Sequence, residues 1–148
     1  MKHLKTFESY DDNKLKRFID INDVADYIND ILVEIKHMDN LYVLSPLIMV
    51  DNTGKLESEI KISSTDSVLY SNKTFKLNED IIEVIKRCSE YLESVGYKLE
   101  VDMQLWYNYT YNEEWMDNDL KANFTDISGL TRYINKKIQY ISLIIKRL

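Results

Sequence analysis

Residues able to carry out chemistry are few in this chain, and histidine is the scarcest of them. The 148 residues include two histidines, His3 and His37, and one cysteine, Cys88. A histidine-centred metal site or a Ser-His-Asp triad needs imidazoles placed beside other ligands or a nucleophile. Cys88 falls in the apolar stripe of an expected helix, where a free thiol behaves as a small hydrophobe. These residues predict no catalytic site and no cofactor.

Carboxylates are the remaining candidates for chemistry. Glu100 and Asp102 share one face of an expected strand, about 7 Å apart, and paired carboxylates can do acid–base work. Glu113, Asp117 and Asp119 lie in an acidic segment that could bind calcium or magnesium, but the glycine and closing glutamate of an EF-hand are missing. We expect a wet strand face and a solvated loop with no metal. A small metal-dependent enzyme is the least favoured alternative.

The most regular element is an expected strand over residues 97–111. Apolar or aromatic residues hold every odd position in this range, and the even positions are mostly polar apart from Trp106. A period of two predicts a strand with one buried face, typical of an antiparallel sheet. Fifteen residues would span roughly 50 Å, so we expect a bend near Trp106 or a split into two strands.

Two amphipathic helices are expected to cover that sheet. Apolar residues recur at spacings of four and three over residues 23–38 and over residues 79–95, which gives each segment one apolar stripe. Asn78 is the expected N-cap of the second helix. Glu83 and Arg87 stand four residues apart, and we expect them to form an ion pair on its surface.

A β-hairpin is predicted over residues 41–63. A dense apolar run is followed by the turn residues Asp-Asn-Thr-Gly and then by alternating apolar and charged residues. Pro46 cannot donate to a ladder, so we expect a bulge or a sheet edge there. A shorter strand is expected within residues 67–77. Residues 17–21 are compatible with either a helical turn or a short strand.

The C-terminal segment, residues 126–148, is predicted to be a helix with surplus apolar surface. An acidic loop is expected directly before it, over residues 112–125. At the other end of the chain, residues 1–12 are expected to form a polar arm. A helix that is apolar over much of its circumference is buried on two sides or pairs with a partner. With the aromatic end of the long strand and one tryptophan of the acidic loop, it supplies the predicted partner-binding residues, Trp106, Tyr109, Tyr111, Trp115, Tyr133, Tyr140, Leu143 and Ile144.

Length and charge narrow the class of protein. The length of 148 residues suggests one α+β domain, an antiparallel β-sheet packed against two amphipathic helices with an additional C-terminal helix. The net charge of −6 argues against nucleic-acid binding. No apolar run approaches the roughly 20 residues needed to span a bilayer. A single cysteine excludes an internal disulfide and favours a reducing compartment.

Two resemblances extend these expectations. The opening Met-Lys-His-Leu-Lys-Thr-Phe-Glu, residues 1–8, resembles the start of many small proteins of tailed bacteriophages. This resemblance implies a phage protein in the host cytoplasm or the virion. The element order is similar to that of the type III secretion chaperones, which are small, acidic and dimeric. If residues 17–21 form a strand, residues 17–107 instead resemble a ferredoxin-like β-α-β-β-α-β unit.

The leading expectation is therefore a non-enzymatic phage protein that binds another protein. It would act as a virion component or as an inhibitor of a host defence factor. The alternative is a chaperone-like dimer that holds a partner polypeptide.

Overall fold

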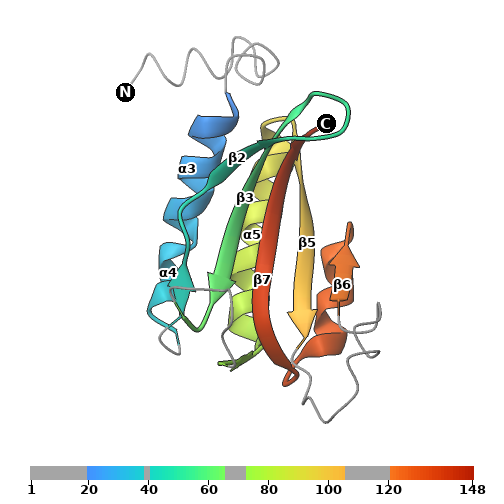
Figure 1. Cartoon of the computed structure of the whole chain (residues 1–148). Helices are drawn as coiled ribbons and strands as arrows, with labels where there is room; N and C mark the ends of the chain where they lie inside the picture. The colour runs from blue at the N-terminus through green and yellow to red at the C-terminus, as the bar shows by residue number, and fades with distance from the viewer. Residues whose placement is uncertain (1–19, 39–40, 66–72, 106–120) are drawn as a thin grey trace.

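The chain folds into two layers, with helices covering one face of an antiparallel sheet (Figure 1). This computed structural model describes residues 20–38, 41–65, 73–105 and 121–148. The layers confirm the expected α+β class. The predicted N-terminal arm over residues 1–12 and the predicted bend near Trp106 lie outside the described residues.

Over the described residues the sheet has seven strands in the order β1-β3-β7-β5-β6, with β2 also paired to β3 and β4 paired to β7. The strands are β1 Tyr42–Val43, β2 Leu47–Val50, β3 Leu56–Ser63, β4 Phe75–Lys76, β5 Tyr97–Leu105, β6 Lys121–Phe124 and β7 Lys137–Arg147. All the pairings are antiparallel. The expected hairpin is confirmed: β2 and β3 meet at a turn where Asp51 accepts hydrogen bonds from the N–H groups of Thr53 and Lys55. Pro46 lies in the break between β1 and β2.

The C-terminal segment is a strand where the sequence predicts a helix. Ile127–Tyr133 form a 3-10 helix, η3, and Lys137–Arg147 form β7, which lies between β3 and β5. The register between β7 and β5 shifts where Gln104 pairs with Tyr140 and Leu105 with Ile138, so Ile138 and Ile141 are both buried although they are three residues apart. A spacing of three residues between buried side chains is also typical of an amphipathic helix, which explains the predicted helix. Pairing on both sides of β7 decides the outcome, because tertiary contacts override a local pattern.

The predicted acidic loop over residues 112–125 also differs from the structure at its end. Lys121–Phe124 form β6, which pairs with β5 and places Ala122 opposite Met103. A four-residue edge strand needs few buried side chains, so its sequence carries too little alternation to be recognised.

Helices α3, α4 and α5 form the second layer. Their bounds are Ile21–Ile31, Val33–Lys36 and Glu79–Ser94. The single helix expected over residues 23–38 is thus two helices, whereas the helix expected over 79–95 is confirmed, with the Asn78 side chain accepting a hydrogen bond from the N–H of Ile81. Asp20 caps α3, so Ile21 is helical and does not belong to a strand.

The strands β3 and β5 and the helix α5 between them form a β-α-β unit with a strand inserted in its middle. Both strands run antiparallel to β7, so they are parallel to each other. In a ferredoxin-like unit the first strand of the chain would take that middle place. Here β7, the last strand, takes it, so the sheet does not have the ferredoxin-like order.

The core lies between this sheet and the helices. Alternate residues of β3, β5 and β7 point toward the helices and are buried there, among them Ile60, Ile62, Val101, Leu143 and Ile145. From the helices, Ile28, Ile35, Ile85 and Leu92 have no exposed surface. The helix-covered face is therefore mostly apolar, with Ser58 as a buried polar residue on β3, and the surface chemistry lies elsewhere.

Candidate functional site

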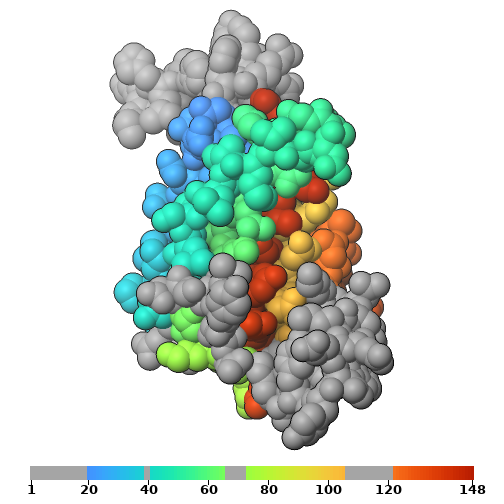
Figure 2. All heavy atoms as spheres, in the orientation of Figure 1, coloured from blue at the N-terminus to red at the C-terminus, as the bar shows by residue number. Residues whose placement is uncertain are grey.

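The sheet face turned away from the helices, here called the open face, carries alternating charges. Atoms of β3, β7 and β5 lie side by side on this face in Figure 2. Lys146 Nζ is 3.1 Å from Glu100 Oε2 and 3.9 Å from Glu57 Oε1. The hydrogen bond to Glu100 raises the pKa of the Lys146 ammonium group. One cation from β7 thus bridges carboxylates of the strands on either side.

A second group of polar side chains surrounds Tyr140 on the open face. Lys61 Nζ lies 5.1 Å from the centre of the Tyr140 ring and 3.7 Å from Glu59 Oε1. Burial raises the pKa of the Tyr140 hydroxyl, and the nearby carboxylates of Glu59 and Asp102 raise it further. The open face is therefore a network of opposite charges and does not present one sign to a partner.

The two carboxylates considered for acid–base chemistry have separate partners on this face. Glu100 pairs with Lys146, and Asp102 accepts a hydrogen bond from the side-chain amide of Asn123. A general base must be within hydrogen-bond reach of a substrate proton. Both side chains are engaged in joining neighbouring strands, and the open face is the wet strand face that their spacing predicts.

The structure separates the predicted partner-binding residues. Tyr140 and Ile144 are half-buried on the open face. Leu143 has no exposed surface and packs under the helices, which corrects its prediction as a contact. Tyr133, on η3, packs edge-on against Phe124 with ring centres 5.4 Å apart. The other four, Trp106, Tyr109, Tyr111 and Trp115, lie outside the described residues.

Cys88 is in the core, as its position in the apolar stripe predicts. Its side chain has no exposed surface, and burial raises the pKa of its thiol to about 12. A reactive thiol needs a lowered pKa and access to solvent. Cys88 has neither property and acts as a packing residue of α5.

Exposed apolar side chains gather at the opposite side of the sheet from β6. Five residues of β1, β2 and the start of β3 form what is here called the apolar edge: Tyr42, Leu47, Ile48, Val50 and Leu56. Leu47 and Val50 are 60% and 64% exposed, which is unusual for a strand with this composition. Among the described residues β1 and β2 pair with β3 alone, so within that part of the chain their outer sides carry unpaired backbone groups.

The sequence did contain one signal for the apolar edge. No charged residue occurs from Leu41 to Val50, and natural edge strands are usually protected by lysine or another charge. A dense apolar run is also what a fully buried strand looks like, and only the strand order distinguishes the two. The partner-binding surface was therefore predicted at the aromatic segments, away from this edge.

Comparison of the chain with protein-family models, with curated proteins and with solved structures gives no significant match. Two properties of the described residues add to the description of the surface. None of their helices combines the length and the apolar character needed to cross a bilayer. Nor do they hold a group of three or more His, Cys, Asp or Glu side chains placed to bind a metal ion. The acidic segment with Glu113, Asp117 and Asp119 lies outside them.

Proposed function

We propose that this chain is a non-enzymatic interaction protein that binds another polypeptide along the apolar edge. The observation that carries the proposal is the exposure of Leu47, Ile48 and Val50 on a strand that pairs, within the described part of the chain, with β3 alone. A partner strand added there would satisfy the free N–H and C=O groups of β2. It would also remove aliphatic side chains from water, at about 25 cal/mol per Å² of apolar surface.

The chemistry of the rest of the sheet supports a binding role over a catalytic one. On the open face, Lys61 and Lys146 neutralise the carboxylates around them. A catalytic pair would instead have carboxylates held in contrasting environments beside a pocket. We place no reacting group on this face and treat it as a surface that keeps β3, β7 and β5 in register.

A double substitution tests the apolar edge. Leu47→Lys with Val50→Lys puts two charges on the exposed side chains of β2 and leaves the buried core unchanged. We expect the native protein to recover one stoichiometric partner from its source cells and the double variant to lose it. Val33→Lys is the control, because Val33 is also an exposed aliphatic residue, 40% exposed, but lies on α4.

Two results would contradict the proposal. Recovery of the same partner by the native protein and by the edge variant would move the binding surface elsewhere. Recovery of no partner, together with a monomeric sedimentation coefficient for the native chain, would remove the proposed function.

The chaperone-like dimer is the second candidate, and the apolar edge favours it for a specific reason. Two copies of β2 can pair antiparallel about a two-fold axis, and the absence of charge from Leu41 to Val50 removes like-charge repulsion between them. Sedimentation velocity distinguishes this case, because the edge variant would then convert a dimer to a monomer.

The phage origin, and with it a place in the host cytoplasm or the virion, is part of the proposal. It is supported by the opening residues 1–8. The neighbouring genes test it: capsid and tail genes beside this one favour a virion component, and early genes favour an inhibitor of a host defence factor.

A further inference from the structure

A groove of about 880 Å³ runs along the outer side of α5, between this helix and η3. Its floor contains the half-buried aliphatic side chains of Ile82, Ile127 and Ile134. The residues of α5 that line it extend from Glu79 to Glu93, which is roughly 21 Å at the rise of an α-helix. This is the length of a short helix or peptide lying parallel to α5.

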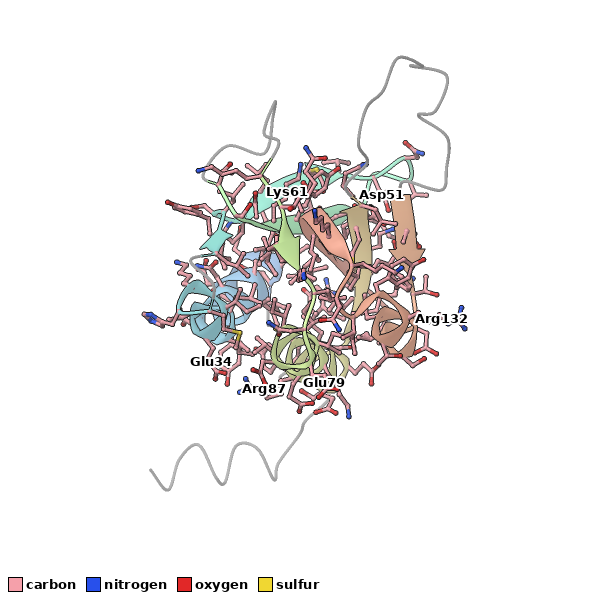
Figure 3. All side chains as sticks on the ribbon, turned by 90° about the horizontal axis from the view of Figure 1, so that it is seen from below. Glu34, Asp51, Lys61, Glu79, Arg87 and Arg132 are labelled. Carbon is pink, nitrogen blue, oxygen red and sulfur yellow. The ribbon has the colours of Figure 1, made fainter. Side chains whose placement is uncertain are left out.

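The rim of the groove is acidic, because its carboxylates outnumber its cations. Of the described residues, one cation, Lys86, and five carboxylates line it: Glu79, Glu83, Glu90, Glu93 and Asp126. Asp126 has a structural partner, since it accepts the N–H of Ser128 and caps η3. Within the described residues, none of the other four forms an ion pair. Arg132 of η3 points away from α5 (Figure 3) and does not line the groove.

The position of Glu93 adds a second, independent observation. It lies in the last turn of α5, which contains no basic residue. The C-terminal end of a helix carries partial negative charge, so a carboxylate there is unfavourable and a lysine or arginine is the usual choice. A cation placed beside Glu90 and Glu93 would interact favourably with both side chains and with the helix end.

We propose that the α5–η3 groove binds a basic amphipathic segment of a partner polypeptide, with aliphatic side chains on the isoleucine floor and lysine or arginine side chains at the acidic rim. In helix-in-groove recognition, apolar side chains along one face of a helix anchor it in the groove. Charge-assisted hydrogen bonds to the acidic rim would set the orientation of the bound segment. The groove lies in the helical layer and the apolar edge on the sheet, so this proposal stands apart from the function proposed above.

Three synthetic peptides and the full-length chain provide the test. The first peptide is a helix of about 14 residues, matched to the length of the groove at 1.5 Å per residue, with leucines on one side and lysines on the other. The second has glutamate in place of lysine, and the third has serine in place of leucine. We expect the first to bind, as measured by calorimetry, and the other two to bind at least about tenfold more weakly.

Matched variants locate the binding. We expect Glu90→Gln with Glu93→Gln to weaken binding of the first peptide about tenfold. Asp26→Asn with Asp30→Asn makes the same change in net charge on the exposed side of α3 and should leave binding unchanged.

The variant with Glu90→Gln and Glu93→Gln also distinguishes a role in binding from a role in stabilising the fold. Removing carboxylates from the C-terminal part of α5 should raise the melting temperature of the free protein while it lowers peptide affinity. Equal weakening by the α3 control would show general attraction to an acidic protein and overturn the proposal. Failure of the first peptide to bind the native chain would overturn it as well.

Discussion

The two sides of α5 differ sharply in how their charges and rings are used. On the side facing α3 and α4, Arg87 donates two hydrogen bonds to the Glu34 carboxylate, at 3.0 and 2.5 Å (Figure 3). The rings of Tyr27 and Tyr91 stack there with centres 4.1 Å apart. On the side facing η3, an acidic groove stays open. The first side is closed by contacts within the chain, and the second carries four glutamates that form no ion pair within the described residues.

This difference shows that an ion pair expected along a helix can be diverted to a tertiary partner. Glu83 and Arg87 have the spacing of a stabilising pair within α5. Arg87 instead pairs with Glu34, and this hydrogen bond lowers the pKa of the Glu34 carboxyl. A planar guanidinium favours such a two-point contact with one carboxylate. Glu83 is then left at the rim of the groove, where it adds to the acidic surface.

The largest loss of stability should come from truncating a residue in the buried apolar stripe of α5, which lies between its two sides. Leu92 has no exposed surface and packs in the core. We expect Leu92→Ala to lower the free energy of unfolding by about 2–5 kcal/mol, because a cavity adds to the lost apolar transfer. Urea titration followed by far-UV circular dichroism measures this loss. A change below about 1 kcal/mol would mean that α5 is not seated on the sheet as described.

Cys88, on the same stripe, gives a pH-dependent effect of intermediate size. Burial raises its pKa from 9.0 to about 12, so the thiol ionises earlier in the unfolded chain than in the native one. Its contribution to stability is complete below pH 9.0 and is lost as the pH rises toward 12. Between pH 8 and pH 10 we expect a loss of about 1.4 kcal/mol. Urea titrations of native and Cys88→Ala protein measure it, because the variant should lack this part of the pH dependence.

The sequence predicted the helices and the hairpin better than it predicted the C-terminal strand. The stripe of α5, its Asn78 cap and the turn at Asp51 are local features, and the structure has all three. The pairing of β7 with β3 and β5 is non-local, and the register shift opposite Leu105 interrupts the period of two in β7. The α5–η3 groove depends on η3, which no period in the sequence indicated. Both candidate surfaces therefore follow from tertiary packing.

The stacked rings allow a smaller test of the closed side. Tyr27 is 51% exposed, so its truncation removes the ring contact with Tyr91 while leaving the core intact. We expect Tyr27→Ala to lower the free energy of unfolding by about 0.5–1 kcal/mol, part of the loss being offset by the higher helix propensity of alanine. Tyr27→Phe keeps the stack and should match the native protein in the same urea titration. Equal losses for both variants would assign the effect to the hydroxyl.

The smallest effects should have opposite signs on the two sides of α5. Glu34→Gln and Glu93→Gln remove the same charge, but Glu34 is paired with Arg87, whereas Glu93 lies unpaired within the described residues at the negative end of the helix. We expect the first substitution to lower the melting temperature slightly and the second to raise it slightly, by differential scanning calorimetry at low salt. High salt should shrink both changes, since both groups are exposed to screening. If both substitutions lowered the melting temperature, Glu93 would have a stabilising partner, and the groove would not be a surface left open for a basic segment.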